Sequence, residues 1–166
     1  MHHIQLINFE HIKESEASTY TFREAVRAIV FDANKKIALL HAKKDNYFKL
    51  PGGGIEKDEE KIEALKRECR EELGCEIDIF CDLGIVTENR SKNKMKHISY
   101  CYMAHVIGEK GTPHMTESEI REGFHVIWIP ITEAILKLES VTNTTYPGSY
   151  MVARDLAFLK IGSHIS

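Results

Sequence analysis

The sequence predicts an α+β fold in which a mixed β-sheet is sandwiched between helices. Several stretches rich in β-branched and aromatic residues are typical of strands, whereas residues 58–74 have the spacing of a helix. The expected order is strands first, then this helix, a hairpin, one more strand and finally further helices. That order differs from the regular βαβ alternation of a parallel doubly wound fold.

The length of 166 residues suits one domain with a sizeable core, whereas two full domains would be cramped. We therefore expect a single domain over residues 1–166. An accessory strand is expected within residues 1–17, and a closing C-terminal helix is expected within residues 145–162.

Composition excludes several classes of protein. Hydrophobic residues make up 43% of the chain and charged residues 28%, as in an ordinary soluble globule. The net charge of −3 argues against a general binder of nucleic-acid duplexes or acidic membranes. Nothing looks like a signal peptide or a membrane-spanning run. The four cysteines show no CxxC spacing, so we expect free thiols and a reducing cytoplasm.

Residues 21–32 and 36–43 are expected to form the first core strands, joined by a turn at 32–35. Along the first of them, Arg23 and Arg27 share one face. Two interpretations stay open for Arg27. It belongs either to a half-exposed sheet face with snorkelling arginines, or to a cleft in which it binds an anion.

The helix that follows has start and stop signals. Asp58 is the expected N-cap, with Glu59 and Glu60 in the first turn, where negative charge suits the helix dipole. Gly74 is placed where a left-handed residue ends a helix. One stripe of the helix is apolar and consists of Ile62, Leu65, Cys69 and Leu73.

Three glutamates of this helix lie within one turn, at the edge of the apolar stripe: Glu68, Glu71 and Glu72. Like charges at such spacing destabilise a helix by a few tenths of a kcal/mol each. A divalent cation removes the conflict, because magnesium and manganese prefer hard oxygen ligands. The alternative is an acidic solvated face.

The later part of the chain completes the predicted sheet. Residues 75–87 and 97–107 are expected to pair as a hairpin. The segment between them is expected to be a solvated tip or a mobile anion-attracting loop, and its basic residues are Arg90, Lys92, Lys94 and Lys96. After a polar loop at 109–122 come a strand at 124–129, a helix capped by Thr132, and an amphipathic helix within 146–161. On that last helix Arg154 and Asp155 form a polar side.

The glycine triplet Gly52, Gly53 and Gly54 precedes the helix and allows close approach of the backbone to a phosphate or a metal. The spacing from Gly53 to Cys75 is glycine, five residues, glutamate, seven residues, Arg-Glu-Cys, one residue, Glu-Glu, one residue, Gly-Cys. This pattern resembles the Nudix box of the Nudix hydrolase family. Cysteine stands at two positions where the family usually has a larger aliphatic residue.

The resemblance implies an α/β/α sandwich and cleavage of a nucleoside diphosphate linked to another moiety, most simply a nucleoside triphosphate or a modified nucleotide. We expect Mg²⁺ or Mn²⁺ to be held by four groups: Glu68, Glu71, Glu72 and the carbonyl of Gly53. Glu68 and Glu71 are also catalytic candidates, with Glu71 as ligand or base, and Arg67 is expected to orient these groups.

Substrate contacts are expected from Arg27, as a phosphate clamp, and from the backbone of Gly52 and Gly54. The resemblance also implies one further carboxylate from the loop before the last core strand, and the sequence does not choose between Glu117 and Glu119.

Two other functions remain open. One is a metabolite-sensing Nudix domain without activity, for which a broken box would be expected. The other is an isomerase acting on an isoprenoid diphosphate, for which Cys101 is the cysteine to inspect. The box does not identify the substrate, and a homodimer formed through the N-terminal strand is possible.

Overall fold

The computed structural model describes residues 1–44, 47–142 and 144–165, with the side chains of residues 118 and 119 also outside the described part. Its seven-stranded sheet has the order β1-β5-β6-β2-β3-β4, and β7 pairs with β3. The strands are β1 (His3–Ile7), β2 (Thr21–Phe31), β3 (Ile37–Ala42), β4 (Tyr47–Lys49), β5 (Glu76–Arg90), β6 (Met95–Ile107) and β7 (Phe124–Ile129). Both parallel and antiparallel pairs occur, so the prediction of a mixed sheet is confirmed.

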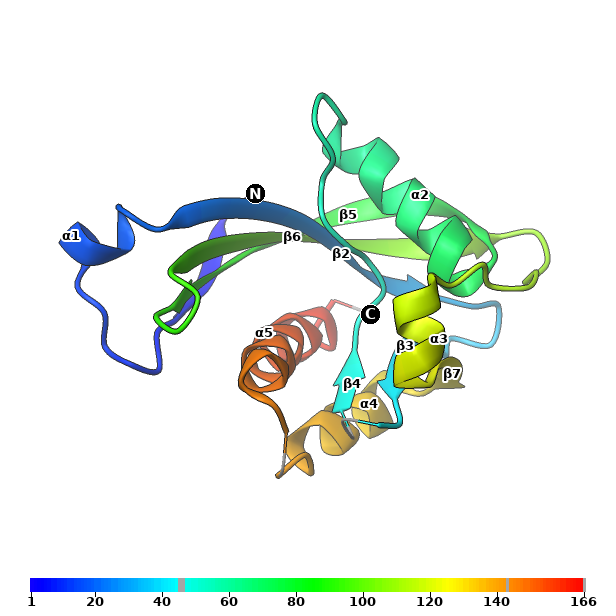
Figure 1. Ribbon diagram of the computed structural model, residues 1–166. Coiled ribbons are helices and arrows are strands. Elements are labelled where there is room, and N and C mark those ends of the chain that lie inside the picture. The colour runs from blue at the N-terminus through cyan, green and yellow to red at the C-terminus, as the bar shows by residue number, and fades with distance from the viewer. Residues whose placement is uncertain (45–46, 143, 166) are drawn as a thin grey trace.

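Helices cover both faces of this sheet. They are α1 (Glu14–Ala17), α2 (Lys61–Leu73), α3 (Glu117–Glu122), α4 (Ile131–Glu139) and α5 (Tyr146–Gly162). Figure 1 shows α2 on one side of β2, β5 and β6, and α5 on the other. In the part of the chain that the structure describes, no helix is long and apolar enough to cross a membrane.

The two faces of β2 belong to different hydrophobic clusters because side chains alternate along a strand. Val26 and Ala28 pack with Leu65 and Cys69 of α2. Ile29 faces the other way, into a cluster that includes Phe158 and Leu159 of α5. The arginines of β2 lie on this second face, toward α5.

The strands β2 and β3 are paired at one position only, Phe31 with Ile37, and diverge beyond it. The glycine loop runs along β2 from there. The backbone N–H of Ala28 donates to the carbonyl of Pro51 (3.0 Å), and that of Val26 donates to the carbonyl of Gly53 (2.9 Å). The divergence of the two strands thus gives the glycine loop a place at the centre of the fold.

The hairpin of β5 and β6 is longer than the sequence indicated. Arg90 is the last residue of β5 and is 7% exposed, and Lys96 lies in β6 and contacts Glu14. Only residues 91–94 form the turn, so Lys92 and Lys94 are the exposed basic residues at the tip. The predicted loop was too long because the end of β5 is polar. Its charged side chains Glu88 and Arg90 pair with each other and are buried.

Two predicted helix caps are wrong. The N-cap of α2 is Glu60 rather than Asp58, and it makes no side-chain cap bond. Asp58 has a left-handed φ of 62°, which places it in the turn before the helix. In α4 the N-cap is Pro130 and not Thr132. The C-terminal signal of α2 is confirmed, because Gly74 has φ 66°.

The N-cap of α5 is Thr145, whose hydroxyl accepts a bond from the N–H of Gly148 (3.2 Å). The predicted polar side of this helix is not solvated, because Arg154 and Asp155 are both 0% exposed. The two side chains bind each other and are buried against the sheet. Helical spacing predicts a solvent-exposed position for Arg154 and Asp155, because spacing alone does not show which charged groups lie beside them in the fold.

Candidate active site

The glycine loop and α2 form one unit. The backbone N–H of Gly52 donates to Oε2 of Glu72 (2.6 Å), and Gly52 has φ 129°. A Cβ at position 52 would lie 2.2 Å from the carbonyl oxygen of Val26. Only glycine therefore fits between β2 and the carboxylate of Glu72.

Gly53 lies directly against Glu68. A Cβ at position 53 would lie 2.1 Å from Oε1 of Glu68, so a larger residue would collide with this carboxylate. The Gly53 carbonyl accepts the bond from Val26 and has one further lone pair available for another partner.

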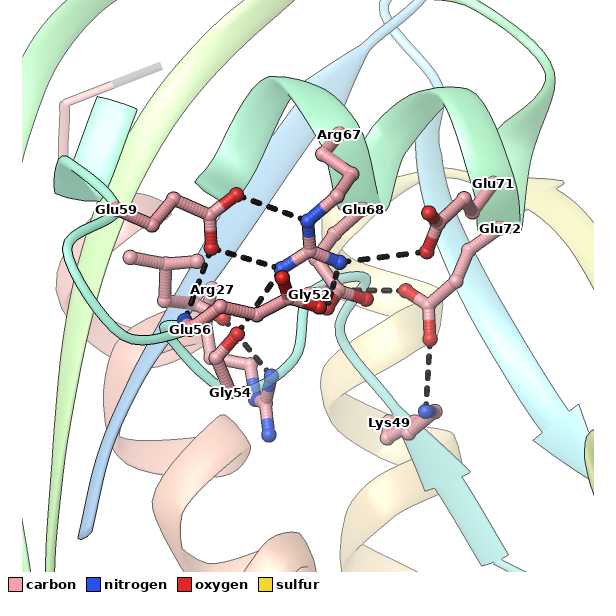
Figure 2. A network of polar contacts seen from close by, with 11 residues as sticks. Arg27, Lys49, Gly52, Gly54, Glu56, Glu59, Arg67, Glu68, Glu71 and Glu72 are labelled. Atoms are coloured by element: carbon pink, nitrogen blue, oxygen red, sulfur yellow. Dashed lines mark hydrogen bonds and ion pairs between the residues drawn. The ribbon is translucent and has the colours of Figure 1, made fainter. Parts of the chain in front are cut away.

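The guanidinium of Arg67 joins the loop to the helix (Figure 2). It donates to both oxygens of Glu59 (2.9 and 3.0 Å), to the carbonyl of Gly54 (3.1 Å) and to Oε1 of Glu68 (2.8 Å). A longer contact of 3.4 Å reaches Glu71. These bonds lower the pKa of Glu59 and raise that of Arg67. Arg67 has the contacts of an orienting residue.

The three box glutamates differ in burial. The side chain of Glu72 is 3% exposed, that of Glu68 is 13% exposed and that of Glu71 is 44% exposed. Burial raises the pKa of Glu72 to about 7. The ammonium of Lys49 acts in the opposite direction, because it favours the ionised carboxylate. Lys49 lies 2.8 Å from Oε1 of Glu72.

The donor set suits magnesium or manganese, because it consists of carboxylate and backbone oxygens on one turn of a helix and one loop. As the side chains stand, however, no three ligating groups among the described residues converge on one point. Protein cations lie between them instead: Lys49 on Glu72, and Arg67 on Glu68 and Glu71. The residues fit the ion in kind, and binding requires the carboxylates of Glu68, Glu71 and Glu72 to turn toward one point.

A cavity of about 640 Å³ lies between the box carboxylates and a basic wall. We call it the arginine cavity. Its lining residues are Arg23, Arg27, Lys49, Gly52, Gly53, Glu56, Arg67, Glu68, Glu71, Glu72, Arg90, His97, Thr116, Pro147, Met151 and Arg154. A cavity with carboxylates on one wall and cationic side chains on the other can hold an anion beside a bound cation.

Arg27 stands in the basic wall of the arginine cavity and is 7% exposed. Its Nη1 donates to the carbonyl of Val26 (2.8 Å), whereas its Nε has no hydrogen-bond partner. Burial, and secondly the charge of Arg154, lower the pKa of Arg27 to about 10. A guanidinium held this way is costly unless an anion completes its bonding.

The floor of the cavity is a buried ion network that the sequence did not reveal. Arg154 binds Asp155 through two bonds (2.7 and 3.0 Å) and lies 3.5 Å from Glu88. Glu88 also binds Arg90. Asp155 in turn accepts a bond from the N–H of Leu50 (2.8 Å), two residues before Gly52. The network thus connects α5 to the start of the glycine loop.

His97 belongs to the same wall and is 4% exposed. Neither ring nitrogen has a hydrogen-bond partner, and Nδ1 lies 3.7 Å from Glu88. Burial, followed by the charges of Arg154 and Arg27, lowers the pKa of His97 to about 2. His97 is therefore neutral near pH 7. The register that pairs it with Glu88 would have revealed its position, but only once the length of the hairpin turn was known.

The remaining sequence candidates are only partly brought together. Gly54 lines an adjoining cavity of about 660 Å³, which shares four lining residues with the arginine cavity: Arg23, Glu56, Arg67 and Glu68. Glu117 is exposed on α3 and does not line the arginine cavity, whereas Thr116 does. Glu119 also falls in α3, and its side chain lies outside the described residues.

Cys101, the cysteine considered for isomerase chemistry, is fully buried, and burial raises the pKa of its thiol. It packs in the cluster formed with α5 and does not line the arginine cavity. The other three cysteines are also free thiols. Nothing in this arrangement supports a reactive cysteine.

Several solved structures have the same fold. The MutT protein from Methanosarcina mazei Go1 is 18% identical, with 89% of this chain and 98% of that chain covered and a TM-score of 0.61. The C. elegans Ap4A hydrolase is 17% identical, with 87% and 98% covered and a TM-score of 0.62. An ADP-ribose pyrophosphatase from Streptococcus suis 89-1591 is 19% identical, with 88% and 94% covered and a TM-score of 0.56.

At these identities the solved structures establish the fold alone, and a comparison with curated proteins finds none that matches. The family itself is established by sequence. A model of the NUDIX domain matches residues 21–147, a range that contains the glycine loop, α2 and the strands around them. The chain therefore belongs to the NUDIX domain family and is a Nudix-type hydrolase.

Proposed function

We propose that the protein hydrolyses a phosphoanhydride bond in a nucleoside diphosphate linked to another moiety, in a reaction that depends on Mg²⁺ or Mn²⁺. A nucleoside triphosphate or modified nucleotide is the simplest substrate. The observation that carries this proposal is the buried Glu72, bound by the N–H of Gly52 and facing a cavity whose opposite wall is basic. A diphosphate needs these two sides, a cation site and a set of cationic donors.

The metal site proposed here consists of Glu68, Glu71, Glu72 and the carbonyl of Gly53. A divalent cation bound there would neutralise the charge of the diphosphate and lower the pKa of a bound water. Glu72 is the ligand with the most restricted position, because Gly52 fixes one of its oxygens. Glu71 is the most exposed of the three and is the candidate to accept a proton from the attacking water.

Arg67 is proposed to orient the site rather than to react. By holding Glu59, Glu68 and the Gly54 carbonyl together, it fixes the distance between loop and helix. The glycine loop and α2 then stay at a fixed distance while the substrate binds, which keeps the reacting groups in position.

Arg27 is proposed to bind a phosphate of the substrate. Its Nε lacks a partner, and it lies in the arginine cavity opposite the box glutamates. A phosphate oxygen would complete its hydrogen bonding and offset the cost of its burial. Backbone groups of Gly52 and Gly54 are proposed as further substrate contacts, and the Glu117–Glu119 turn of α3 as a source of one more carboxylate.

The names of the structural relatives cover a MutT protein, an Ap4A hydrolase and an ADP-ribose pyrophosphatase. They support a nucleotide derivative as substrate without distinguishing between the three kinds. The free thiols are compatible with a reducing compartment such as the cytoplasm.

A substrate panel tests the proposal. The protein is incubated with nucleoside triphosphates, oxidised nucleotides, dinucleoside polyphosphates and nucleotide sugars, each with Mg²⁺, with Mn²⁺ and with a chelator. We expect release of phosphate, pyrophosphate or a nucleoside monophosphate from at least one class, and only when metal is present. Absence of turnover on every class with either metal contradicts the proposal and favours a sensing role.

A further inference from the structure

Lys49 and Glu72 form a pair that the proposed reaction does not explain. Lys49 is the last residue of β4, and its Nζ lies 2.8 Å from Oε1 of Glu72. The two side chains are 12% and 3% exposed. The other oxygen of Glu72 accepts the bond from Gly52. Both oxygens of the buried carboxylate therefore already have partners, as Figure 2 shows.

The ammonium of Lys49 and a divalent cation would compete for this carboxylate. Two cations on one buried glutamate repel each other strongly, because the surroundings screen their charges poorly. The described carboxylates also converge on no common point while the protein cations lie between them. Repulsion by a divalent cation bound to Glu72 therefore favours departure of the ammonium from Oε1.

Lys49 has a further contact besides Glu72. In the same position its Nζ lies 4.7 Å from the centroid of the Phe124 ring, within the range of a cation–π contact, so this ring stabilises the ammonium independently of Glu72. Lys49 also lines the arginine cavity, together with Arg27. A short rotation of its side chain would turn the ammonium away from Glu72 and leave it facing the cavity that is proposed to hold the substrate phosphates.

We propose that Lys49 exchanges partners during binding: it neutralises Glu72 until a divalent cation takes the carboxylate, and it then binds a phosphate of the substrate. This inference rests on the proposed function. It makes Lys49 a residue that couples the two binding events, because the cation releases the ammonium that the anionic substrate then uses. A purely structural Lys49–Glu72 pair would instead stay closed in both states.

The first test measures Mn²⁺ binding by electron paramagnetic resonance, without substrate. Lys49→Met removes the competitor for Glu72, so its Mn²⁺ dissociation constant is expected to fall by about fivefold or more relative to the unmodified protein. Lys66→Met is the matched control, since Lys66 lies on α2 and pairs with the exposed Glu63. An unchanged or weaker affinity for Mn²⁺ in Lys49→Met overturns the proposal.

The second test needs no variant and remains valid if Lys49→Met does not fold. The unmodified protein is treated briefly with acetic anhydride, and acetylation of each lysine is measured by mass spectrometry. We expect Lys49 to become several-fold more reactive when Mn²⁺ saturates the protein, and to be protected again by added pyrophosphate. The reactivity of Lys66 should not change. Unchanged reactivity of Lys49 at saturating Mn²⁺ overturns the proposal.

The metal site and the exchange of Lys49 can be tested separately. If the unmodified protein binds no Mn²⁺, both the proposed metal site and the exchange are wrong. If it binds Mn²⁺ and hydrolyses a nucleotide while Lys49 stays protected, the proposed function stands and only the exchange is wrong.

Discussion

Arg67 and Glu59 form a two-point ion pair, with Nε 2.9 Å from Oε1 and Nη2 3.0 Å from Oε2. Glu59 directly follows the turn that leads from the glycine loop to α2, and Arg67 lies two helical turns further on, within α2. The planar guanidinium matches both oxygens of the carboxylate, and its remaining N–H groups reach Gly54 and Glu68.

Arg67→Lys is therefore expected to reduce turnover by roughly 10- to 100-fold, the usual effect of losing a group that orients a metal ligand. A lysine keeps the charge but cannot bind Glu59 at two points and Gly54 at a third. Steady-state kinetics with the best substrate of the panel measures the effect. Arg70→Lys is the control, because Arg70 makes an exposed pair with Glu76 and should keep normal turnover. Equal kinetics in the two variants would show that the fork geometry of Arg67 is unimportant.

Gly52→Ala is expected to destabilise the fold by about 2 kcal/mol or more, through both its φ of 129° and the collision with the Val26 carbonyl. Urea denaturation measures the free energy of unfolding. Gly54→Ala is the control, since a Cβ at position 54 would lie 3.3 Å from Nη2 at the end of the flexible Arg23 side chain. A stability of Gly52→Ala close to that of Gly54→Ala would show that the loop does not pack against β2 as described.

Arg27→Met is expected to raise the KM for substrate by roughly 10- to 100-fold, the value of one charge-assisted hydrogen bond. The same substitution is expected to leave the free energy of unfolding equal or higher, because it removes a buried cation whose Nε has no hydrogen-bond partner. Kinetics and urea denaturation on the same preparation give both values. A loss of stability with unchanged KM would assign Arg27 a structural role.

His97 gives a pH dependence whose sign follows from its depressed pKa. Below pH 6.5 the unfolded chain binds a proton at this histidine, whereas the folded chain does not until about pH 2. The wild type should therefore lose up to about 2 kcal/mol of stability from this residue between pH 7.5 and pH 5.0.

Urea denaturation of His97→Gln at both pH values measures this contribution, because the variant lacks the titrating ring. The fall in stability should be smaller in His97→Gln than in the wild type, and a substitution at the exposed His164 serves as control. Identical falls in the wild type and His97→Gln would mean that His97 takes up its proton in the folded protein.

The box helix and its carboxylates could be predicted because their signal is local. Gly74 ends α2, the stripe of Leu65, Cys69 and Leu73 is buried, and Glu72 lies at its edge. The start of the helix was misjudged by two residues. Asp58 has the chemistry of a cap, but the pairing of Glu59 with Arg67 determines the path of the preceding turn.

The basic wall could not be predicted because it is assembled by tertiary contacts. Arg154 and Asp155 looked solvent-facing by helical spacing, and Glu88, the second carboxylate beside Arg154, is 66 residues away from it in sequence. Arg90 looked like part of a loop, because composition does not show whether four or nine residues connect the two strands. The pairing of Lys49 with Glu72 joins residues 23 positions apart in sequence, so it also depends on tertiary structure.

Glu72→Gln tests whether Glu72 holds the metal on which hydrolysis depends. Glutamine keeps the shape and loses the negative charge, so metal-dependent turnover should fall by about 100-fold or more, with Mn²⁺ binding weakened in parallel. Glu63→Gln, on the exposed side of the same helix, should keep wild-type values. Near-normal turnover and Mn²⁺ binding in folded Glu72→Gln would contradict the assignment of the metal site.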